Sequence, residues 1–431
     1  MGIYSELYIS FLLKINILHI MYFINLILKR SIQLGALWFV VWVIWANTQL
    51  YYTPTWAQKV NSDALAQLKY LKKTLKTTDA AAQMQQLYPE GAFFLTVLYG
   101  LAWTDIAEKV DTGSVIMQEA EREIVWAFNQ LSEDSLCKAV FDSTLLLNYG
   151  AFYNGWRGYL LGRYCMAFRK QGHDEERYEH FRYLCDDINT AFLAAKSPYL
   201  ESYLHQSWPA DNILCLATLS LHDSIFHEAF TDTRKRWLDS IQQHLDPTTG
   251  LIPHSYHLTA NEIRETPRGC SQSMMLSFLP MIDSAFSQAQ FAKFQQHFMM
   301  KKWGIWSVRE YPQGVDGKGD VDSGPIILGV GGAASIVGIR AAGENQKAFL
   351  HANFRNAIEM LGFPSHFNGE KSYLLKQLPI ADAFIAWVSA KDYDFKNPKY
   401  AYWQWEFHLW SLLLVSAPCY YLGLYFVKYF L

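Results

Sequence analysis

Short joints rich in glycine, proline and polar residues recur through the middle of this chain, and each stands directly before an apolar stretch. They recur roughly every 50–65 residues, which is the length of one helical hairpin with its loops. Six hairpins that close into a ring form an (α/α)6 barrel, with apolar inner helices, amphipathic outer helices and the polar joints at one rim. An open α-solenoid is the alternative, but it needs more uniform repeats. The joints read "YPEG" near residue 90, "YNGWRG" near 154, "SWPADN" near 209, "PRGCSQ" near 269, "DVDSGP" near 322 and "LPIADA" near 379.

The pattern between the joints is helical. Apolar residues recur at helical spacing through most of residues 59–400, and no series of alternating strands is comparably strong. We therefore expect one all-α, (α/α)6-barrel (toroid) domain of the catalytic type over 59–400. The predicted helices include 92–108, 113–130, 156–170, 176–195, 211–227, 231–244, 271–285, 289–301, 325–341 and 347–361.

Apolar runs at both ends of the chain predict transmembrane helices. Residues 31–58 carry no charge and include the almost wholly apolar run "LGALWFVVWVIWA" (34–46), and residues 409–427 are also uncharged and long enough to span a hydrocarbon core. Residues 8–28 are also apolar but contain Lys14, which leaves open a third span or an interfacial helix. The alternative is that soluble, buried helices stand at both ends. Three tryptophans suit an interfacial aromatic belt: Trp403, Trp405 and Trp410.

The charges beside the first span predict its orientation. Lys29 and Arg30 stand just before it, and the positive-inside tendency keeps them in the cytoplasm. No small-residue cleavage site follows, so we interpret the run as an anchor. The expected organisation is a membrane segment over 1–58, the barrel on the extracytoplasmic (periplasmic) side, and a transmembrane helix in 401–431.

Charge and cysteine usage exclude several classes of protein. The net charge is −3 and no long basic block occurs, so nucleic-acid binding is not expected. The six cysteines include no CxxC pair, which leaves a zinc or thioredoxin-type site without support. Aromatic residues make up 16% of the chain, and such rings stack on sugars, enclose hydrocarbon or fill cores. No metal and no cofactor is predicted, and the oligomeric state is left open.

The strongest catalytic candidates are Asp320 and Asp322, in a turn bracketed by Gly319 and Gly324. One aspartate is enough to cap a helix, so the second is free to face the mouth of the barrel. We expect Asp320 or Asp322 to project there. An unpaired buried carboxylate is costly, so a basic partner such as Arg157, Arg268 or His257 should lie beside it.

Two other joints supply the expected facing carboxylates, Asp211 and Glu90. Either could instead serve only as a helix cap or complement the helix dipole. Carboxylates crowded at one rim share protons, which supplies an acid and a base at neutral pH. His257 completes the predicted catalytic set. The predicted substrate-binding residues are Tyr153, Trp156, Arg157, His205, Trp208, Tyr256 and Arg268.

Residues 88–361 resemble the linalool dehydratase/isomerase family in several successive blocks. The matching blocks are "YNGWRGYLLGRYCMAFRKQG", "YLESYLHQSWPADNILCLATLSL", "WLDSIQQHLDPTTGLIPHSYH" and "GDVDSGPIILGVGGAAS". The resemblance implies an (α/α)6 barrel with cofactor-free acid/base chemistry on an isoprenoid alcohol, namely dehydration and allylic isomerisation. The chain departs from the family pattern where Trp156 stands in place of a catalytic histidine, and where Leu204 and Ile213 stand in place of a cysteine pair.

These observations predict a membrane-anchored barrel enzyme acting on a small molecule. The resemblance favours a lyase or isomerase acting on an isoprenoid-like alcohol. Paired carboxylates with aromatic walls suit equally a glycan-processing hydrolase, lyase or epimerase, because both chemistries need an acid, a base and rings. A non-catalytic barrel that binds a ligand or a partner is the third hypothesis.

Overall fold

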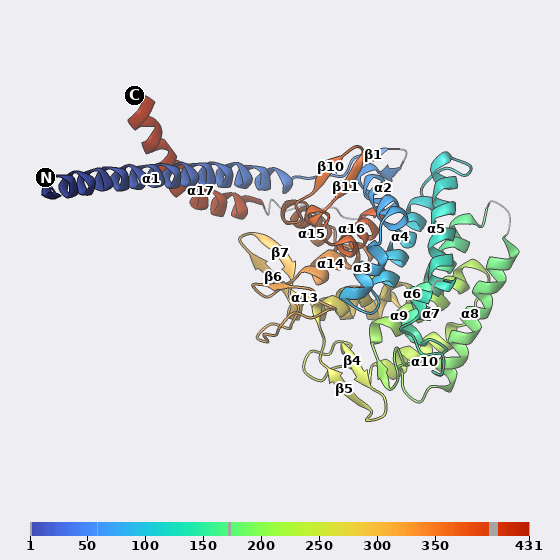
Figure 1. Ribbon diagram of the computed structural model, residues 1–431. Helices are drawn as coiled ribbons and strands as arrows, with labels where there is room; N and C mark the ends of the chain where they lie inside the picture. The colour runs from blue at the N-terminus through green and yellow to red at the C-terminus, as the bar shows by residue number, and fades with distance from the viewer. Residues whose placement is uncertain (1, 58, 134, 171–173, 396–403, 431) are drawn as a thin grey trace. The chain divides into compact units, whose positions relative to one another are not determined.

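The computed structural model describes residues 2–57, 59–133, 135–170, 174–395 and 404–430 (Figure 1). The chain divides into two compact units. One consists of Met1–Tyr51 with Tyr402–Leu431, and the other is Tyr52–Ala401. Trp403, which we expect in an interfacial belt, lies outside the described residues.

The first unit consists of the helices α1 (Gly2–Gln49) and α17 (Gln404–Phe430). His19–Gln49 and Gln404–Tyr425 are long and apolar enough to cross a membrane, as judged from length and composition. Helix α1 is continuous, so residues 8–28 and the apolar run 34–46 belong to one helix. Lysine and arginine are good helix formers, so charges inside an apolar run do not interrupt the helix.

Polar side chains join the two helices of this unit near one end. The amide nitrogen of Asn47 donates to the Ser411 hydroxyl at 2.9 Å, and Asn47 Oδ1 lies 2.5 Å from His408 Nδ1. The other ring nitrogen of His408 is 2.6 Å from the Tyr51 hydroxyl. Farther along, the Arg30 guanidinium lies over the Tyr425 ring. Such interhelical bonds hold apolar helices together where apolar burial alone gives little preference.

The second unit is built around six inner helices that form a closed ring. Each packs against the next inner helix along the chain, and the last packs against the first. Every residue of the first except Phe94 is buried, which explains its uninterrupted apolar sequence. The inner helices are α4 (Gly91–Ala107), α7 (Gly150–Phe168), α9 (Pro209–Ile225), α11 (Gly269–Leu276), α14 (Gly332–Glu344) and α16 (Pro379–Ala390).

Six amphipathic helices pack outside this ring, so the predicted (α/α)6 barrel is confirmed. Gly158 shows how closely the layers approach, since a Cβ there would lie 2.6 Å from Leu184 on α8 and 3.0 Å from Thr218 on α9. The outer helices are α2 (Ser62–Thr77), α5 (Val115–Glu133), α8 (Glu175–Ala194), α10 (Thr231–Ile241), α13 (Ser284–Phe298) and α15 (Ala348–Leu361). Short helices in the connections are α3 (Ala80–Leu87), α6 (Ser135–Lys138), α12 (Leu279–Ile282) and the 3₁₀ turn η1 (Leu374–Lys376).

Small antiparallel sheets also occur in the connections. The expected helix from residue 325 is wrong at its start, because a hairpin occupies Ile326–Gly331 and α14 begins at Gly332. The turn of that hairpin needs positive φ at Leu328 and Gly329, which a helix does not allow. The pairs are β1 (Trp56–Ala57) with β2 (Val60–Asn61), β6 (Met299–Lys302) with β7 (Ile305–Val308), β8 (Ile326–Ile327) with β9 (Val330–Gly331), and β10 (Ser365–Phe367) with β11 (Glu370–Ser372). One sheet has three strands, β3 (Gln206–Ser207), β4 (Ser255–His257) and β5 (Glu262–Glu265), in that order.

Aromatic rings fill the middle of the barrel. Trp156 packs edge-on against Phe94, Phe278 and Trp387, so rings from different inner helices and their ends meet there. Toward the C-terminal ends of the inner helices, Asp105 pairs with Arg163 at 2.9 Å and with Arg340 at 2.6 Å. Each inner helix is preceded by an outer helix that runs the other way, so all six inner helices begin at the same rim, which holds the candidate site.

Candidate active site

Three carboxyl groups from three different connections influence one another at this rim. Glu90 directly precedes α4, Asp211 lies in the first turn of α9, and Asp322 lies in the turn before β8. Burial raises the pKa of Asp211 to about 8, the negative charges of Glu90 and Asp322 add to the rise, and a 2.6 Å hydrogen bond from the Ser202 hydroxyl partly offsets it. Asp211 is therefore mostly protonated at neutral pH.

Glu90 is half-buried and accepts a hydrogen bond from the Tyr203 hydroxyl. Burial raises the pKa of Glu90, the bond from Tyr203 opposes the rise, and the charge of Asp322 adds to it. The residue after it must be glycine, because a Cβ at Gly91 would lie 2.1 Å from the carbonyl oxygen of Met84. Tyr203 is a site residue that sequence analysis missed, since it belongs to no recognisable motif.

Asp320 has a structural role in its turn. Its carboxylate makes a two-pronged ion pair with Arg268, in which Nη2 is 2.7 Å from Oδ1. It also accepts the backbone N–H groups of Asp322 and Ser323, each at 3.1 Å. Burial alone would raise the pKa of Asp320, but the bonds from Arg268 and Ser323 lower it to about 2. Asp320 thus holds the turn in place, and the side chain of Asp322 remains 52% exposed.

Arg268 is almost fully buried and has a second acidic partner, Glu310. The distance from Arg268 Nε to Glu310 Oε1 is 2.9 Å, and Glu310 has no exposed surface. Glu310 also accepts from the backbone N–H and the thiol of Cys270, at 3.3 and 3.0 Å. Burial raises the pKa of Glu310, although the bonds from Cys270 and Arg268 act in the other direction. Sequence analysis missed Glu310 because it lies outside the joints.

His254 is the histidine beside the carboxylates. Its Nε2 is 3.3 Å from Asp322 Oδ2, and its Nδ1 is 3.0 Å from the Ser271 hydroxyl. The predicted histidine, His257, instead lies on β4, where its Nδ1 accepts the backbone N–H of Ala260 at 3.1 Å. Along an extended segment neighbouring side chains alternate between faces, so residues three apart point to opposite sides.

Among the predicted binding residues, Trp208 packs against Tyr203, the partner of Glu90. It is half-buried, and its ring meets that of Tyr203 edge-on with centroids 5.5 Å apart. His205 is exposed and lies beside Glu201, with 3.7 Å between its Nδ1 and a carboxylate oxygen. Tyr256 is buried, and its hydroxyl donates to Asn261 at 3.0 Å.

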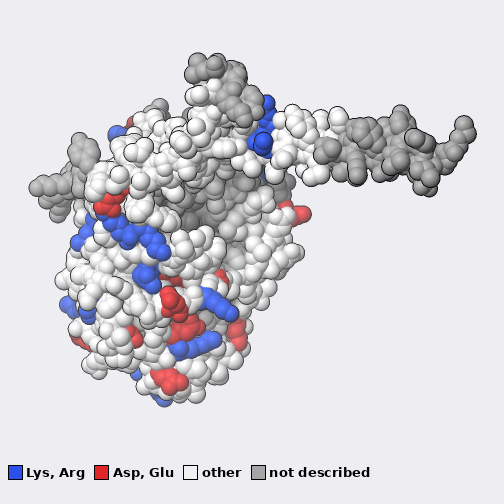
Figure 2. All heavy atoms as spheres, turned by 90° about the vertical axis from the view of Figure 1, so that its left-hand side faces the viewer, with Lys and Arg blue, Asp and Glu red and all other residues white. Residues whose placement is uncertain are grey.

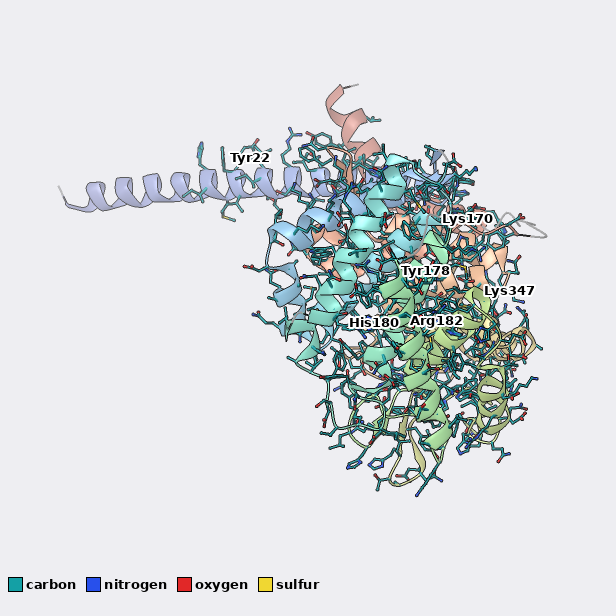
Figure 3. The ribbon with its side chains drawn as sticks, turned by 90° about the vertical axis from the view of Figure 1, so that its right-hand side faces the viewer. Tyr22, Lys170, Tyr178, His180, Arg182 and Lys347 are labelled. Atoms are coloured by element: carbon teal, nitrogen blue, oxygen red, sulfur yellow. The ribbon has the colours of Figure 1, made fainter. Side chains whose placement is uncertain are left out.

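Tyr153, Trp156 and Arg157 lie away from the carboxylates, contrary to expectation. The Tyr153 hydroxyl donates to the carbonyl oxygen of Leu131 on α5, and Trp156 belongs to the buried rings. Arg157 Nε donates to the Ser132 hydroxyl at 2.8 Å, and its Nη2 is 2.8 Å from Nε2 of His180, which Figure 3 labels. Burial lowers the pKa of Arg157. Tyr153 and Arg157 therefore link α7 to outer helices, whereas Trp156 packs among rings of the inner helices and their ends.

The surface of the barrel has two depressions, one away from the carboxyl groups and one beside the Asp320 turn. One of about 520 Å³ lies between the ends of α7 and α9 and the start of α8, and Lys170, Tyr178 and Arg182 border it (Figure 3). The second, of about 470 Å³, borders the Asp320 turn and is lined in part by Arg309 and Tyr311. Figure 2 shows acidic and basic side chains intermixed on one face of the molecule. Within the described ranges, no group of three or more His, Cys, Asp or Glu side chains could hold a metal ion.

Comparison with known proteins gives matches among solved structures only. No family model and no curated protein matches the chain. A family 105 glycoside hydrolase from C. acetobutylicum is 12% identical, with a TM-score of 0.44 over 73% of this chain and 99% of its own. A possible member of that family from Klebsiella pneumoniae is 12% identical, with a TM-score of 0.47 over 79% and 98%. An unsaturated glucuronyl hydrolase specific for heparin is 14% identical, with a TM-score of 0.42 over 75% and 96%.

The resemblance to the linalool dehydratase/isomerase family is wrong. The three solved structures named above are described as glycoside hydrolases or as a glucuronyl hydrolase, and no family model and no curated protein matches the chain. The reaction on an isoprenoid alcohol that the resemblance implied is withdrawn with it.

Proposed function

We propose that this protein is a membrane-anchored, glycan-active enzyme that uses Asp211 as its general acid and Asp322 as its general base or nucleophile. The observation that supports this most strongly is the difference between these two carboxyl groups at one rim. Asp211 is buried and retains its proton at neutral pH, whereas Asp322 is exposed to solvent. Most glycoside hydrolases use two carboxyl groups in different environments, one as the general acid and one as the base or nucleophile.

The proposed reaction transfers two protons. Asp211 gives its proton to the glycosidic oxygen as the bond to the anomeric carbon breaks, so the leaving sugar departs as an alcohol. Asp322 takes a proton from the water that attacks the same carbon, or attacks first and is displaced by water afterwards. Glu90 keeps negative charge near Asp211, which raises the pKa of the acid.

The surroundings of the carboxyl groups favour a polar substrate. Below the rim, the rings of Trp156, Phe278 and Trp387 pack against one another, so the apolar interior is filled by the protein's own side chains. At the rim, Trp208 and Tyr203 are only half-buried and offer ring faces and edges beside the carboxyl groups. Aromatic rings of this kind stack on the apolar faces of sugars.

The proposed location of the barrel is extracytoplasmic. Lys29 and Arg30 precede the apolar run 34–46 of α1, and the positive-inside tendency keeps them in the cytoplasm. The C-terminal helix α17 then returns the chain to the cytoplasmic side.

The test is turnover by the purified full-length protein in detergent. A panel of neutral and acidic oligosaccharides is incubated with the wild type and with Asp211→Asn and Asp322→Asn, and new reducing ends are counted. We expect both variants to lose at least about a hundredfold in rate, the usual contribution of a general acid or base. The control is Asp382→Asn, another buried carboxyl group near the start of an inner helix. Binding of a glycan without turnover by the wild type would favour a binding barrel instead.

A further inference from the structure

His254 is a buried rim histidine that the proposed reaction has not yet used. It immediately precedes β4, and its backbone N–H donates to the carbonyl oxygen of Glu265 at 3.1 Å, which anchors the segment. Only 3% of the side chain is exposed. Its two ring nitrogens face different partners, with Ser271 of α11 beside Nδ1 and Asp322 beside Nε2.

The partners of Ser271 place a hydrogen on His254 Nδ1. The Ser271 hydroxyl donates to the carbonyl oxygen of Arg268 at 3.0 Å, and a carbonyl oxygen can only accept. Having given its one hydrogen there, the hydroxyl acts as an acceptor toward His254 Nδ1, 3.0 Å away. The neutral ring therefore carries its hydrogen on Nδ1 and presents a lone pair at Nε2.

Nε2 faces carboxylate oxygens, at 3.3 Å from Asp322 Oδ2 and 3.8 Å from Glu265 Oε2. A lone pair facing a carboxylate is repelled, whereas a second proton on the ring converts the same contact into an ion pair. A positive charge on His254 also lowers the pKa of the buried Glu310. The nearby Arg268 is paired with Asp320 and Glu310.

We propose that His254 is a positioning residue whose second proton holds Asp322 in its working orientation at the rim. When Nε2 loses its proton to solvent, its lone pair faces the Asp322 carboxylate. Because both groups are acceptors, His254 no longer holds Asp322 in place. The charge of Asp322 also acts on Glu90 and Asp211. The consequence for turnover rests on the proposed function, since Asp322 serves there as base or nucleophile.

The coupling itself is measurable without a substrate. Deuterium exchange at the ring C2–H of each histidine, followed by mass spectrometry over a pH series, gives individual titration midpoints in the full-length protein. We expect the midpoint of His254 to move to lower pH in Asp322→Asn, because the negative partner is gone. His257 is the internal control, since its ring accepts the Ala260 backbone N–H, and its midpoint should stay where it is. An unmoved His254 midpoint overturns the proposal, whether or not a glycan substrate is found.

Turnover provides the second measurement. His254→Gln keeps an N–H donor available to Asp322 at every pH and does not titrate. We expect its kcat to lose the pH dependence that His254 causes, with KM near that of the wild type. A kcat profile identical to that of the wild type contradicts the positioning role. If His254 and Asp322 prove coupled in the exchange experiment but no glycan is turned over, the proposed function fails and the pairing of the two residues stands.

Discussion

Replacing Asp211 with asparagine should stabilise the fold while it destroys the proposed acid. Only 7% of Asp211 is exposed, and its pKa is about 8 in the folded chain. An unfolded chain gives an aspartate its ordinary pKa of about 3.9. Between these values the folded state holds a proton that the unfolded state has lost, so the free energy of unfolding falls as pH rises. Asparagine is neutral throughout and can still accept from Ser202.

The magnitude follows from the width of this pH window. Each pH unit inside it is worth about 1.4 kcal/mol, so at pH 7 the wild type has lost about 4 kcal/mol that the variant keeps. Below pH 4 Asp211 is protonated in both the folded and the unfolded chain. The difference in unfolding free energy between the wild type and the variant then no longer depends on pH, and only a constant offset remains. Above pH 8 both states are ionised, and the difference stops growing.

The assay is denaturant unfolding of the full-length protein and of Asp211→Asn at a series of pH values in the same detergent. Asp382→Asn is a matched control, because burial raises the pKa of Asp382 to about 7 although neither Glu90 nor Asp322 contributes to its shift. It should show a similar pH-dependent stabilisation and keep its activity. Asp320→Asn should do the opposite and lose stability above about pH 4, since the pKa of Asp320 is lowered. A stability difference for Asp211→Asn that is flat between pH 4.5 and 7.5 would refute the assignment of the proton to Asp211.

Three further predictions concern the charge network and the topology. Glu90→Gln removes a negative charge that raises the pKa of Asp211, so the alkaline limb of the activity profile should move to lower pH; an unmoved limb contradicts the coupling. Arg268→Met leaves Glu310 buried without its cation and should cost about 3–5 kcal/mol in denaturant unfolding, whereas Lys235→Met on the exposed side of α10 should cost little. Reporter fusions after residues 60 and 431 should report opposite sides of the membrane, and a cytoplasmic signal from residue 60 reverses the proposed orientation.

The helical ring could be predicted from the sequence because its signals are local. The apolar period of each helix and the glycine or proline at each joint depend on residues only a few positions apart. Four of the six joints lead directly into an inner helix, namely α4, α9, α11 and α16, whereas the joint "YNGWRG" lies inside α7, which begins at Gly150. The remaining joint does not lead directly into its helix, because the turn that holds Asp320 and Asp322 continues into the β8–β9 hairpin. The residues that follow have a helical pattern, and this pattern hides the pairing of the two strands.

The grouping of Glu90, Asp211 and Asp322 near one rim also follows from the joints, since equal hairpins bring equivalent joints together. Which side chain within a joint faces the site does not follow from spacing. Arg157 is a charged residue in a predicted joint, as a rim residue would be. Its position on α7, however, directs its side chain toward α5 and α8.

The amino-acid sequence by itself determined that six hairpins close into a barrel, that both ends are apolar helices, and that acidic residues gather where the inner helices begin. Only the tertiary structure decided that Asp211 holds a proton, that Asp320 is held by Arg268, and that His254 rather than His257 lies beside Asp322. The reason is physical: a helix is specified by neighbours in the chain, whereas a protonation state depends on burial and on charges that are far apart in sequence and close in space.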